Sequence, residues 1–196
     1  EKYLKYVLTS GEAAIKSLKE KKFGVKFFHL GPERDMSMFT GWEKNKTILK
    51  KCDFILCTGL FDEQEDDLNY YKELLKSHTS KKLICTNPDL IVHRGEEEEL
   101  CAGAVAEVFK SLGGEVVYFG KPYKQVYDLC LKSDEKTLVI GDNLDTDIRG
   151  ANNLNLDSLF ITGGVHRSEH KEDNELENLL KKHKVKIQYF QKKLHW

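Results

Sequence analysis

No stretch of this sequence is apolar for the roughly 20 residues that a membrane-spanning helix needs. The sequence also lacks an excess of charge of either sign, because 31 basic and 32 acidic residues leave a net charge of −1. This balance provides no general attraction to nucleic acid or to an anionic membrane surface. We therefore expect neither a nucleic-acid partner nor a membrane partner.

A Cys-x-x-Cys pair is absent as well, so the cysteines do not have the spacing of a zinc site. The five cysteines are odd in number and scattered along the chain. This usage is typical of reduced, mostly buried thiols, and we expect a cytoplasmic protein. No repeat and no low-complexity linker appears in the 196 residues, whose hydrophobic share of 40% suffices for a core.

Apolar runs and helical patterns alternate along the chain, which predicts an α/β fold with a mostly parallel sheet. Thr9 or Ser10 is expected to cap a helix that continues to Lys22, after a strand that ends at 6–8. The apolar tail 185–196 is expected to dock on the protein. The remaining predicted strands are 25–30, 53–60, 83–85, 116–119, 138–140 and 158–162, and the remaining predicted helices are 68–75, 101–112, 123–131 and 172–183.

The stretch 137–149 is the centre of the functional prediction. Leu138, Val139 and Ile140 predict a short strand buried on both faces, and Asp142 follows at its carboxyl end, where ligands bind in α/β sheets. Thr146 is predicted to cap a helix that begins near Asp147.

Hard oxygen ligands that follow one strand suit Mg²⁺ held beside a phosphate. The alternative is a loop built from turn-forming Asp and Asn residues with one capping threonine. The oxygen-bearing side chains at this strand end are those of Asp142, Asn143, Asp145 and Asp147.

Two further strand ends carry polar residues. Gly120-Lys121-Pro122 places a lysine where its ammonium would balance acidic groups and a phosphate, although a lysine beside a proline is often simply exposed. Thr86-Asn87-Pro88-Asp89 follows another strand, and the extended run 90–94 leads to an acidic hairpin tip at 96–99. Asn87, Asp89, His93 and Arg94 are candidates for substrate binding, against the alternative of a turn with an exposed arginine.

At this point the sequence resembles the haloacid dehalogenase superfamily, in particular its class IIA, NagD-like phosphatases. Gly120-Lys121-Pro122 is similar to the third motif of that family, and 141–147 is similar to the fourth. Segments 86–89 and 101–104 are similar to signatures of the family's large cap domain.

The resemblance implies a partial Rossmann-like core at 1–25 and 118–196, with an inserted α/β cap domain at 26–117. It implies Mg²⁺-dependent hydrolysis of a small phosphorylated metabolite through an aspartyl-phosphate. Asp142 is then the metal ligand, Lys121 and Asp147 are catalytic, and Asn143 and Thr146 support the site.

The family's nucleophile is the first aspartate of an Asp-x-Asp-Gly motif, and neither that motif nor the second motif with its Ser or Thr is found here. We therefore expect an amino-terminally truncated phosphatase that is inactive by itself, with an unpaired place in its core sheet beside 138–140. Such an open edge predicts a homo-oligomer or poor solubility. The alternatives are a non-catalytic binding or regulatory protein that keeps the fold, and a phospho-acceptor receiver domain, against which the cap-like segments and the length argue.

Overall fold

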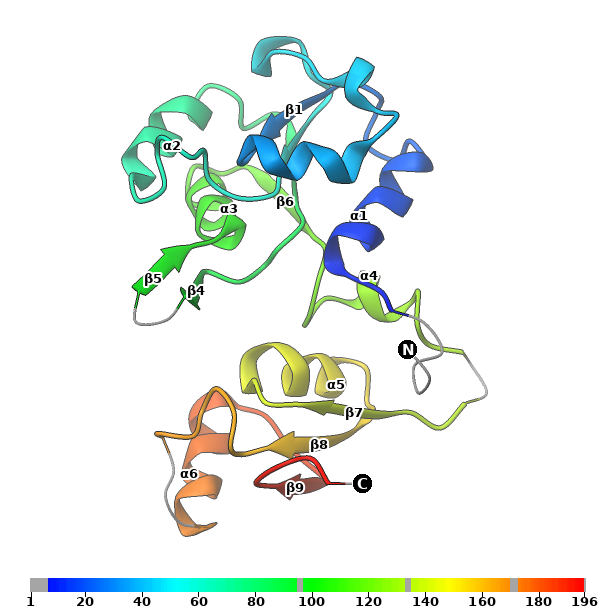
Figure 1. The fold of residues 1–196 in the computed structure, drawn as a ribbon, viewed down its shortest axis with the longest axis vertical. Helices are drawn as coiled ribbons and strands as arrows, with labels where there is room; N and C mark the ends of the chain where they lie inside the picture. The colour runs from blue at the N-terminus through cyan, green and yellow to red at the C-terminus, as the bar shows by residue number, and fades with distance from the viewer. Residues whose placement is uncertain (1–6, 95–96, 133–134, 170–172, 196) are drawn as a thin grey trace. The chain divides into compact units, whose positions relative to one another are not determined.

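The computed structural model describes residues 7–94, 97–132, 135–169 and 173–195. The chain divides into two compact units, Glu1–Gly120 and Lys121–Trp196, which are described separately here. Figure 1 draws the first unit in blue to green and the second mostly in yellow to red. The division falls between two residues of the Gly-Lys-Pro segment, so Lys121 belongs to the second unit.

The first described element is α1 (Ser10–Lys19), which begins with a reciprocal capping box. The Thr9 hydroxyl accepts the Glu12 backbone N–H at 3.1 Å, and the Glu12 carboxylate accepts the Thr9 N–H at 2.8 Å. This confirms Thr9 as the cap, since two backbone donors find partners without help from distant residues. The predicted strand before the helix is not present at Val7 and Leu8, and Tyr6 lies outside the described residues.

A parallel four-stranded sheet forms the centre of the first unit, in the order β1-β2-β3-β6. All four side chains of the Phe-Ile-Leu-Cys strand β2 are buried, as expected for an inner strand covered on both faces. The strands are β1 (Phe27–Leu30), β2 (Phe54–Cys57), β3 (Lys82–Cys85) and β6 (Glu115–Tyr118). They confirm the predicted parallel α/β arrangement.

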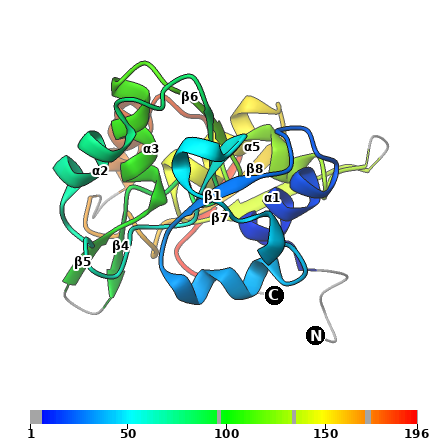
Figure 2. The same ribbon diagram turned by 90° about the horizontal axis from the view of Figure 1, so that it is seen from above.

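Helix α3 (Ala102–Ser111) packs on β2, β3 and β6, and α2 (Leu68–Leu75) lies beside α3. Both views show these two helices as neighbours (Figures 1 and 2). The six buried residues of α3 are small or apolar, which lets the helix lie close to the sheet. Between β1 and β2 the chain forms short 3₁₀ turns, η1 (Glu33–Phe39), η2 (Glu43–Asn45) and η3 (Leu49–Lys51).

A small antiparallel hairpin consists of β4 (Ile91–Arg94) and β5 (Glu97–Leu100). The prediction that 96–99 forms only the tip is therefore wrong for residues 97–99, which continue the second strand. Residues 95–96 lie outside the described residues.

The second unit contains a parallel sheet in the order β7-β8-β9. Its strands are β7 (Leu138–Gly141), β8 (Asp157–Ile161) and β9 (Tyr189–Gln191). The expectation that strand 138–140 is buried on both faces is wrong, because Leu138 is 45% and Ile140 is 39% exposed. The reason is topological: in the described residues β7 has β8 as its only neighbour. Pairing of β9 with β8 confirms that the tail docks.

The helical elements of this unit are α4 (Lys124–Tyr127), the π-helical turn η4 (Leu144–Ile148), α5 (Arg149–Asn153) and α6 (Asp173–His183). The prediction that Thr146 caps the helix after β7 is wrong. Asn143 is the cap, because it keeps an extended backbone and its side chain accepts the Asp145 N–H at 2.9 Å. The apolar core joins η4, β8 and α6 through Leu144, Ile148, Phe160, Leu176 and Leu179, and Val185 after α6 also belongs to it.

Within the described residues, none of the helices is long and apolar enough to cross a membrane. The predicted cap, 26–117, and the described part of 1–25 both lie in the first compact unit. Compactness alone does not say which residues belong to an inserted domain, so the predicted boundaries stay a prediction.

Candidate active site at the end of β7

Asp142 is half-buried and follows directly on β7, as expected from its place in the sequence. Its Oδ2 accepts the backbone N–H of Val165 at 3.1 Å, from the loop that follows β8. One carboxylate oxygen is thus held by the protein, while Oδ1 has no hydrogen-bond partner among the described residues. Asp142 therefore presents a fixed carboxylate with one oxygen available to a cation.

Asp147 and Lys121 come together in the same unit. The Lys121 ammonium donates to Asp147 Oδ1 at 2.6 Å, and the backbone N–H of Asn143 donates to Asp147 Oδ2 at 3.2 Å. The Asp147 side chain is 8% exposed, whereas that of Lys121 is 53% exposed. A buried carboxylate with both oxygens satisfied thus anchors an ammonium whose stem reaches solvent.

Two glycines make room for these carboxylates. A Cβ atom placed on Gly141 would lie 2.2 Å from Asp147 Cγ, and one placed on Gly164 would lie 2.1 Å from Asp142 Oδ2. Neither distance is sterically possible, and in both cases the obstacle is a polar side chain that is already hydrogen-bonded. Gly141 and Gly164 therefore let the backbone approach the two aspartates closely.

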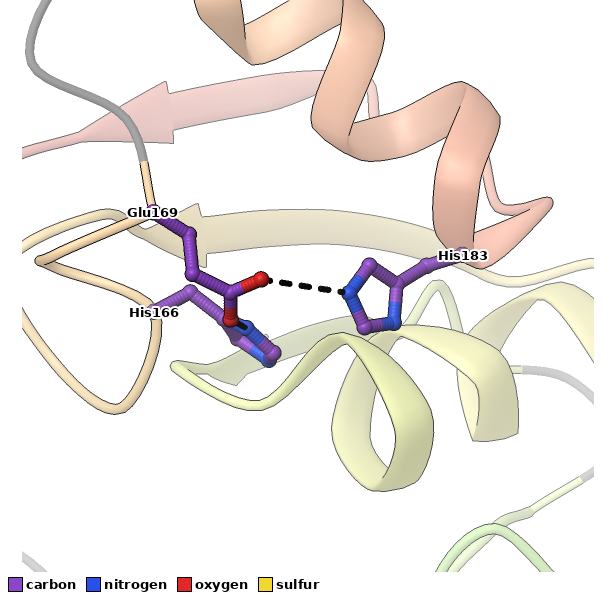
Figure 3. Close-up of side chains that lie close together, drawn as sticks. All are labelled: His166, Glu169 and His183. Carbon is purple, nitrogen blue, oxygen red and sulfur yellow. Dashed lines mark hydrogen bonds and ion pairs between the residues drawn. The ribbon is translucent and has the colours of Figure 1, made fainter.

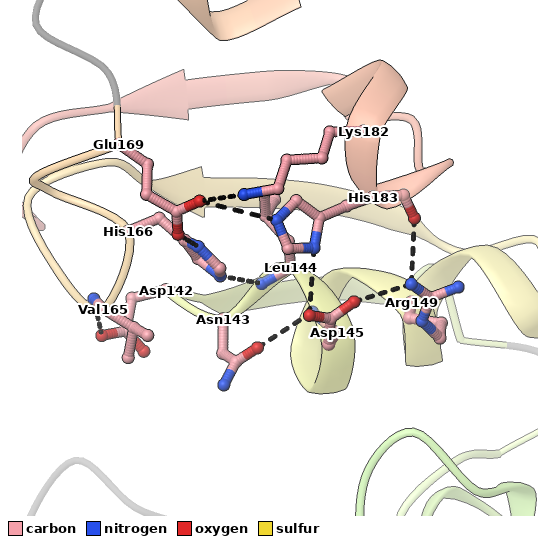
Figure 4. Close-up of polar contacts among 10 residues, drawn as sticks. All are labelled: Asp142, Asn143, Leu144, Asp145, Arg149, Val165, His166, Glu169, Lys182 and His183. Atoms are coloured by element: carbon pink, nitrogen blue, oxygen red, sulfur yellow. Dashed lines mark hydrogen bonds and ion pairs between the residues drawn. The ribbon is translucent and has the colours of Figure 1, made fainter. Parts of the chain in front are cut away.

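The third aspartate of this stretch, Asp145, serves a different purpose. Its two oxygens accept hydrogen bonds from Arg149 at 2.7 Å and from His183 Nδ1 at 3.0 Å, as Figure 4 shows. Burial would raise the pKa of Asp145, but the bonds from Arg149 and His183 outweigh it and hold that pKa below its ordinary value. Asp145 thus joins η4 to α6. The aspartates that the sequence grouped as oxygen ligands therefore have different partners: Val165 for Asp142, Arg149 and His183 for Asp145, and Lys121 for Asp147.

Asn143 and Thr146, predicted to support the site, lie in or beside η4. Asn143 caps the turn and also donates its backbone N–H to Asp147, so it shapes the site through its main chain. The half-buried Thr146 side chain has no hydrogen-bond partner in the described part of the chain. Asn143 thus caps η4 and holds Asp147, whereas the supporting role of Thr146 stays a prediction.

The predicted substrate-binding residues lie in the first unit. The Asn87 side chain accepts the Asp89 backbone N–H at 3.2 Å, which is the hydrogen bond of an Asx turn and matches the simpler alternative for this segment. Backbone pairing places His93 and Arg94 in β4, opposite Glu98 and Glu97 of β5. The side chains of His93 and Arg94 lie outside the described part of the structure.

Asn87 also lines a cavity of about 650 Å³ beside the carboxyl ends of β1, β2 and β3. Arg34 in that cavity pairs with Asp62 at 2.6 Å, so its charge is compensated. An acidic lining of this kind repels a phosphate. The other acidic residues that line the cavity are Asp35, Glu63, Glu65, Asp66, Glu98 and Glu99.

Reasoning from the sequence did not find Val165, which binds Asp142, or His166, whose Nε2 accepts the Leu144 N–H at 3.2 Å. The available signal was the pair Gly163-Gly164 at the end of a predicted strand. Two adjacent glycines after a strand indicate a close backbone approach, but not the side chain that is approached.

Residues 118–182 match the HAD-hydrolase-like family. The ribonucleotide monophosphatase NagD of Escherichia coli K12 is 31% identical over 88 residues, which are 43% of this chain and 34% of NagD. A haloacid dehalogenase-like hydrolase from Brucella suis 1330 is 34% identical, with a TM-score of 0.72 over 82% of this chain and 65% of that one. The chain belongs to the haloacid dehalogenase superfamily.

Within this superfamily the chain is a class IIA, NagD-like protein, as the resemblance indicated. A p-nitrophenyl phosphatase from Archaeoglobus fulgidus shares the fold, with a TM-score of 0.72 over 93% of this chain at 18% identity. The chain spans about a third of the length of the curated phosphatases that it matches. The receiver-domain alternative finds no support in these similarities.

Proposed function

We propose that this chain supplies the metal-binding aspartate and the phosphate-binding lysine of a Mg²⁺-dependent phosphomonoesterase. The observation that carries the proposal is the arrangement at the end of β7. Asp142 offers a carboxylate oxygen without a hydrogen-bond partner among the described residues, and the neighbouring Asp147 holds the Lys121 ammonium at 2.6 Å. A carboxylate for a cation next to a fixed ammonium suits a phosphate dianion, which attracts both.

The donor set of this strand end fits Mg²⁺. Proteins bind this ion through one or two carboxylates and leave its other positions to water and phosphate oxygens. Asp142 Oδ1 is the ligand that this chain would contribute. The ion would supply charge neutralisation on the phosphate oxygens.

Lys121 has two tasks in this proposal. Its ammonium binds a non-bridging phosphate oxygen, and it stabilises the charge that develops as the phosphoryl group is transferred. Asp147 keeps the ammonium in place, since one of its oxygens accepts the Lys121 ammonium and the other accepts the Asn143 backbone N–H. Val165 and Asn143 orient the two carboxylates through their backbone N–H groups.

The nucleophile is not among the described contacts, and the sequence contains no Asp-x-Asp-Gly motif. We propose that these 196 residues alone release no phosphate, because in-line attack on phosphorus needs a carboxylate across the phosphate from the leaving group. We propose a small phosphorylated metabolite as substrate, with Asn87, Asp89, His93 and Arg94 contributing to its selection.

The test uses the 196-residue chain and a longer polypeptide that joins it to an Asp-x-Asp-Gly segment. The chain alone should not hydrolyse p-nitrophenyl phosphate. The longer polypeptide should do so only with Mg²⁺, and Asp142→Asn should abolish that activity while leaving the thermal unfolding curve nearly unchanged. Mg²⁺-dependent hydrolysis by the chain of verified mass, or full activity of Asp142→Asn, would contradict the proposal.

We propose as a second candidate a non-catalytic binding or regulatory protein that keeps the fold and the groups at the end of β7. Under this alternative the chain binds inorganic phosphate with Mg²⁺ at the end of β7 but never turns a substrate over. Phosphate binding by the chain, measured by isothermal titration, is expected under both the phosphatase and the non-catalytic candidate. The phosphatase activity of the longer polypeptide distinguishes the two. Binding in the absence of activity in both forms supports the non-catalytic candidate.

A further inference from the structure

A cluster of two histidines and one glutamate lies in the second unit, apart from the contacts of Asp142 and Lys121. His166 and Glu169 belong to the loop after β8, and His183 ends α6 (Figure 3). One possible ligand atom from each residue lies within 4.8 Å of the other two. The side chains of His166, Glu169 and His183 are 7%, 34% and 13% exposed, so the cluster is largely shielded from water.

His183 has the hydrogen-bonding pattern of a metal ligand. Its Nδ1 donates to Asp145 Oδ2 at 3.0 Å, which leaves the lone pair of the neutral ring on Nε2. The Nε2 atom is buried and has no hydrogen-bond partner in the described part of the chain. A buried acceptor without a donor is unfavourable, and an ion would satisfy it.

The distance between Nε2 of His183 and Oε2 of Glu169 is 4.0 Å. This separation is too long for a hydrogen bond. Two atoms that share one zinc ion at about 2.0–2.1 Å each are about 3.4 Å apart in tetrahedral geometry. The gap is therefore closer to that of two ligands on one ion than to that of a donor and its acceptor, and a shift of a few tenths of an ångström completes it.

Glu169 is suited to bind a cation. Hydrogen bonds from Lys182 and from His166 lower the pKa of Glu169 to about 2, so the group is an anion at neutral pH. His166 Nδ1 lies 2.6 Å from Glu169 Oε1, so the His166 imidazole also contacts this carboxylate. The Lys182 side chain, which bonds Oε2 at 2.7 Å, is 67% exposed and can turn to solvent when an ion arrives.

We propose that His166, Glu169 and His183 form a binding site for a divalent transition-metal ion, with Zn²⁺ as the first choice. Two imidazoles and one carboxylate are a ligand set that zinc uses, whereas Mg²⁺ and Ca²⁺ prefer oxygen alone. Asp145 supplies the outer carboxylate that orients a zinc-binding histidine, since it holds Nδ1 of His183.

Binding displaces existing hydrogen bonds of His166. His166 Nε2 accepts the Leu144 N–H at 3.2 Å, so its ring proton is on Nδ1, the atom that faces Glu169. The ion replaces that proton, the ring carries its proton on Nε2 instead, and the Leu144 N–H must turn to another acceptor. We therefore expect Zn²⁺ to bind more weakly here than at a site with no competing hydrogen bond.

A bound ion would fasten the loop after β8 to the end of α6. The same loop provides the Val165 N–H that holds Asp142. The metal would thus stiffen the backbone behind the candidate active site without taking part in it. The inference does not depend on phosphatase activity, and it is tested by binding alone.

The experiment is isothermal titration of the chain with ZnSO₄, with excess MgCl₂ present to occupy the Asp142 carboxylate, and thermal unfolding with and without Zn²⁺. We expect one Zn²⁺ per chain and a higher melting temperature, since a ligand that binds the folded state stabilises it. Glu169→Gln and His183→Ala should each weaken Zn²⁺ binding at least about tenfold. His195→Ala, at an exposed histidine near the end of the chain, is the matched control and should bind as the unchanged protein does.

Absence of Zn²⁺ binding, or equal binding by Glu169→Gln and His183→Ala, would overturn the proposal. Should a variant unfold, the visible spectrum of the unchanged chain with Co²⁺ decides instead. Ligand-field bands without a thiolate charge-transfer band support a histidine and carboxylate site. A thiolate band would assign the ion to a cysteine and sink the proposal.

Discussion

The Lys121 ammonium lies 2.6 Å from the Asp147 carboxylate, and only the carboxylate is buried, since Lys121 is 53% and Asp147 is 8% exposed. The pair therefore has a buried end and a solvent-exposed end. The aspartate is set in the turn after β7 and held by the Asn143 N–H, and the lysine extends from it. This difference in exposure suits the proposed role of Lys121, whose ammonium must be accessible to bind a phosphate oxygen.

We predict that Lys121→Ala lowers phosphatase activity at least about tenfold in the longer polypeptide that contains a nucleophile, as the loss of one preorganised charge does. Its effect on the free energy of unfolding should stay near 1 kcal/mol, because the pair is open to solvent on the lysine side. The control is Lys124→Ala, which removes an exposed lysine paired with Asp128 in α4. Steady-state kinetics that show equal activity for the two variants would remove Lys121 from the site.

We predict that alanine substitutions at Asn87, Asp89, His93 and Arg94 change the preference among phosphorylated metabolites more than the rate on p-nitrophenyl phosphate. The reason is that a small aryl phosphate needs only the phosphate-binding groups. Relative kcat/KM values over a panel of substrates provide the measurement. Equal losses on all substrates would indicate that the Asn87 turn acts only through the fold.

We predict that a substitution at Tyr127 stabilises the fold, whereas most substitutions destabilise a protein. Its Oη is buried without a hydrogen-bond partner in the described residues, and burial raises the pKa of Tyr127 to about 12. Tyr127→Phe should therefore increase the free energy of unfolding by about 1 kcal/mol. The control is Tyr118→Phe, which loses a 2.8 Å bond to Glu107 and should be less stable than the unchanged chain. Urea denaturation that ranks both variants below the unchanged chain would contradict the prediction.

At acidic pH, the free energy of unfolding should depend on the ionisation of Glu169. Its pKa in the folded chain is about 2 against an ordinary value of 4.5, so its ionised form stabilises the fold above about pH 4.5. That contribution is lost as the pH falls from 4.5 toward 2. Glu169→Gln should flatten the dependence of unfolding free energy on pH in this window, whereas Glu177→Gln, at an exposed residue of α6, should not. Identical slopes from denaturant titrations of the two variants would argue against this assignment.

The outer strand of the second sheet predicts self-association. Ile140, Leu159 and Tyr189 pair in register across β7, β8 and β9 and so share one face, on which Ile140 is 39% and Tyr189 is 58% exposed. An apolar face beside a strand edge that has no partner among the described residues favours contact with another chain. Light scattering should therefore find oligomers that Ile140→Lys reduces. Ile48→Lys, at a residue 60% exposed in the first unit, should leave the mass unchanged. A monomer at all concentrations would refute the prediction.

Features that depend on neighbouring residues could be predicted from the sequence. The capping box of Thr9 and Glu12 spans one helical turn, and β2 is recognisable because four consecutive apolar residues are all buried. The family was recognisable for a similar reason, since its motifs are short and contiguous. Local hydrogen bonds and side-chain periodicity suffice at this range.

Tertiary structure decided where the side chains of the central motif point. Asp142, Asp145 and Asp147 are close in sequence, but their side chains contact Val165, His183 and Lys121 respectively. Asp142 directly follows β7, whereas Asp145 and Asp147 lie in the π-helical turn η4. Their partners lie up to 38 residues away, so their identity depends on how loops and helices pack. The exposure of β7 likewise follows from strand order, and the meeting of His166 with His183 follows from the docking of α6 on η4. Residue types alone carry no record of such long-range packing.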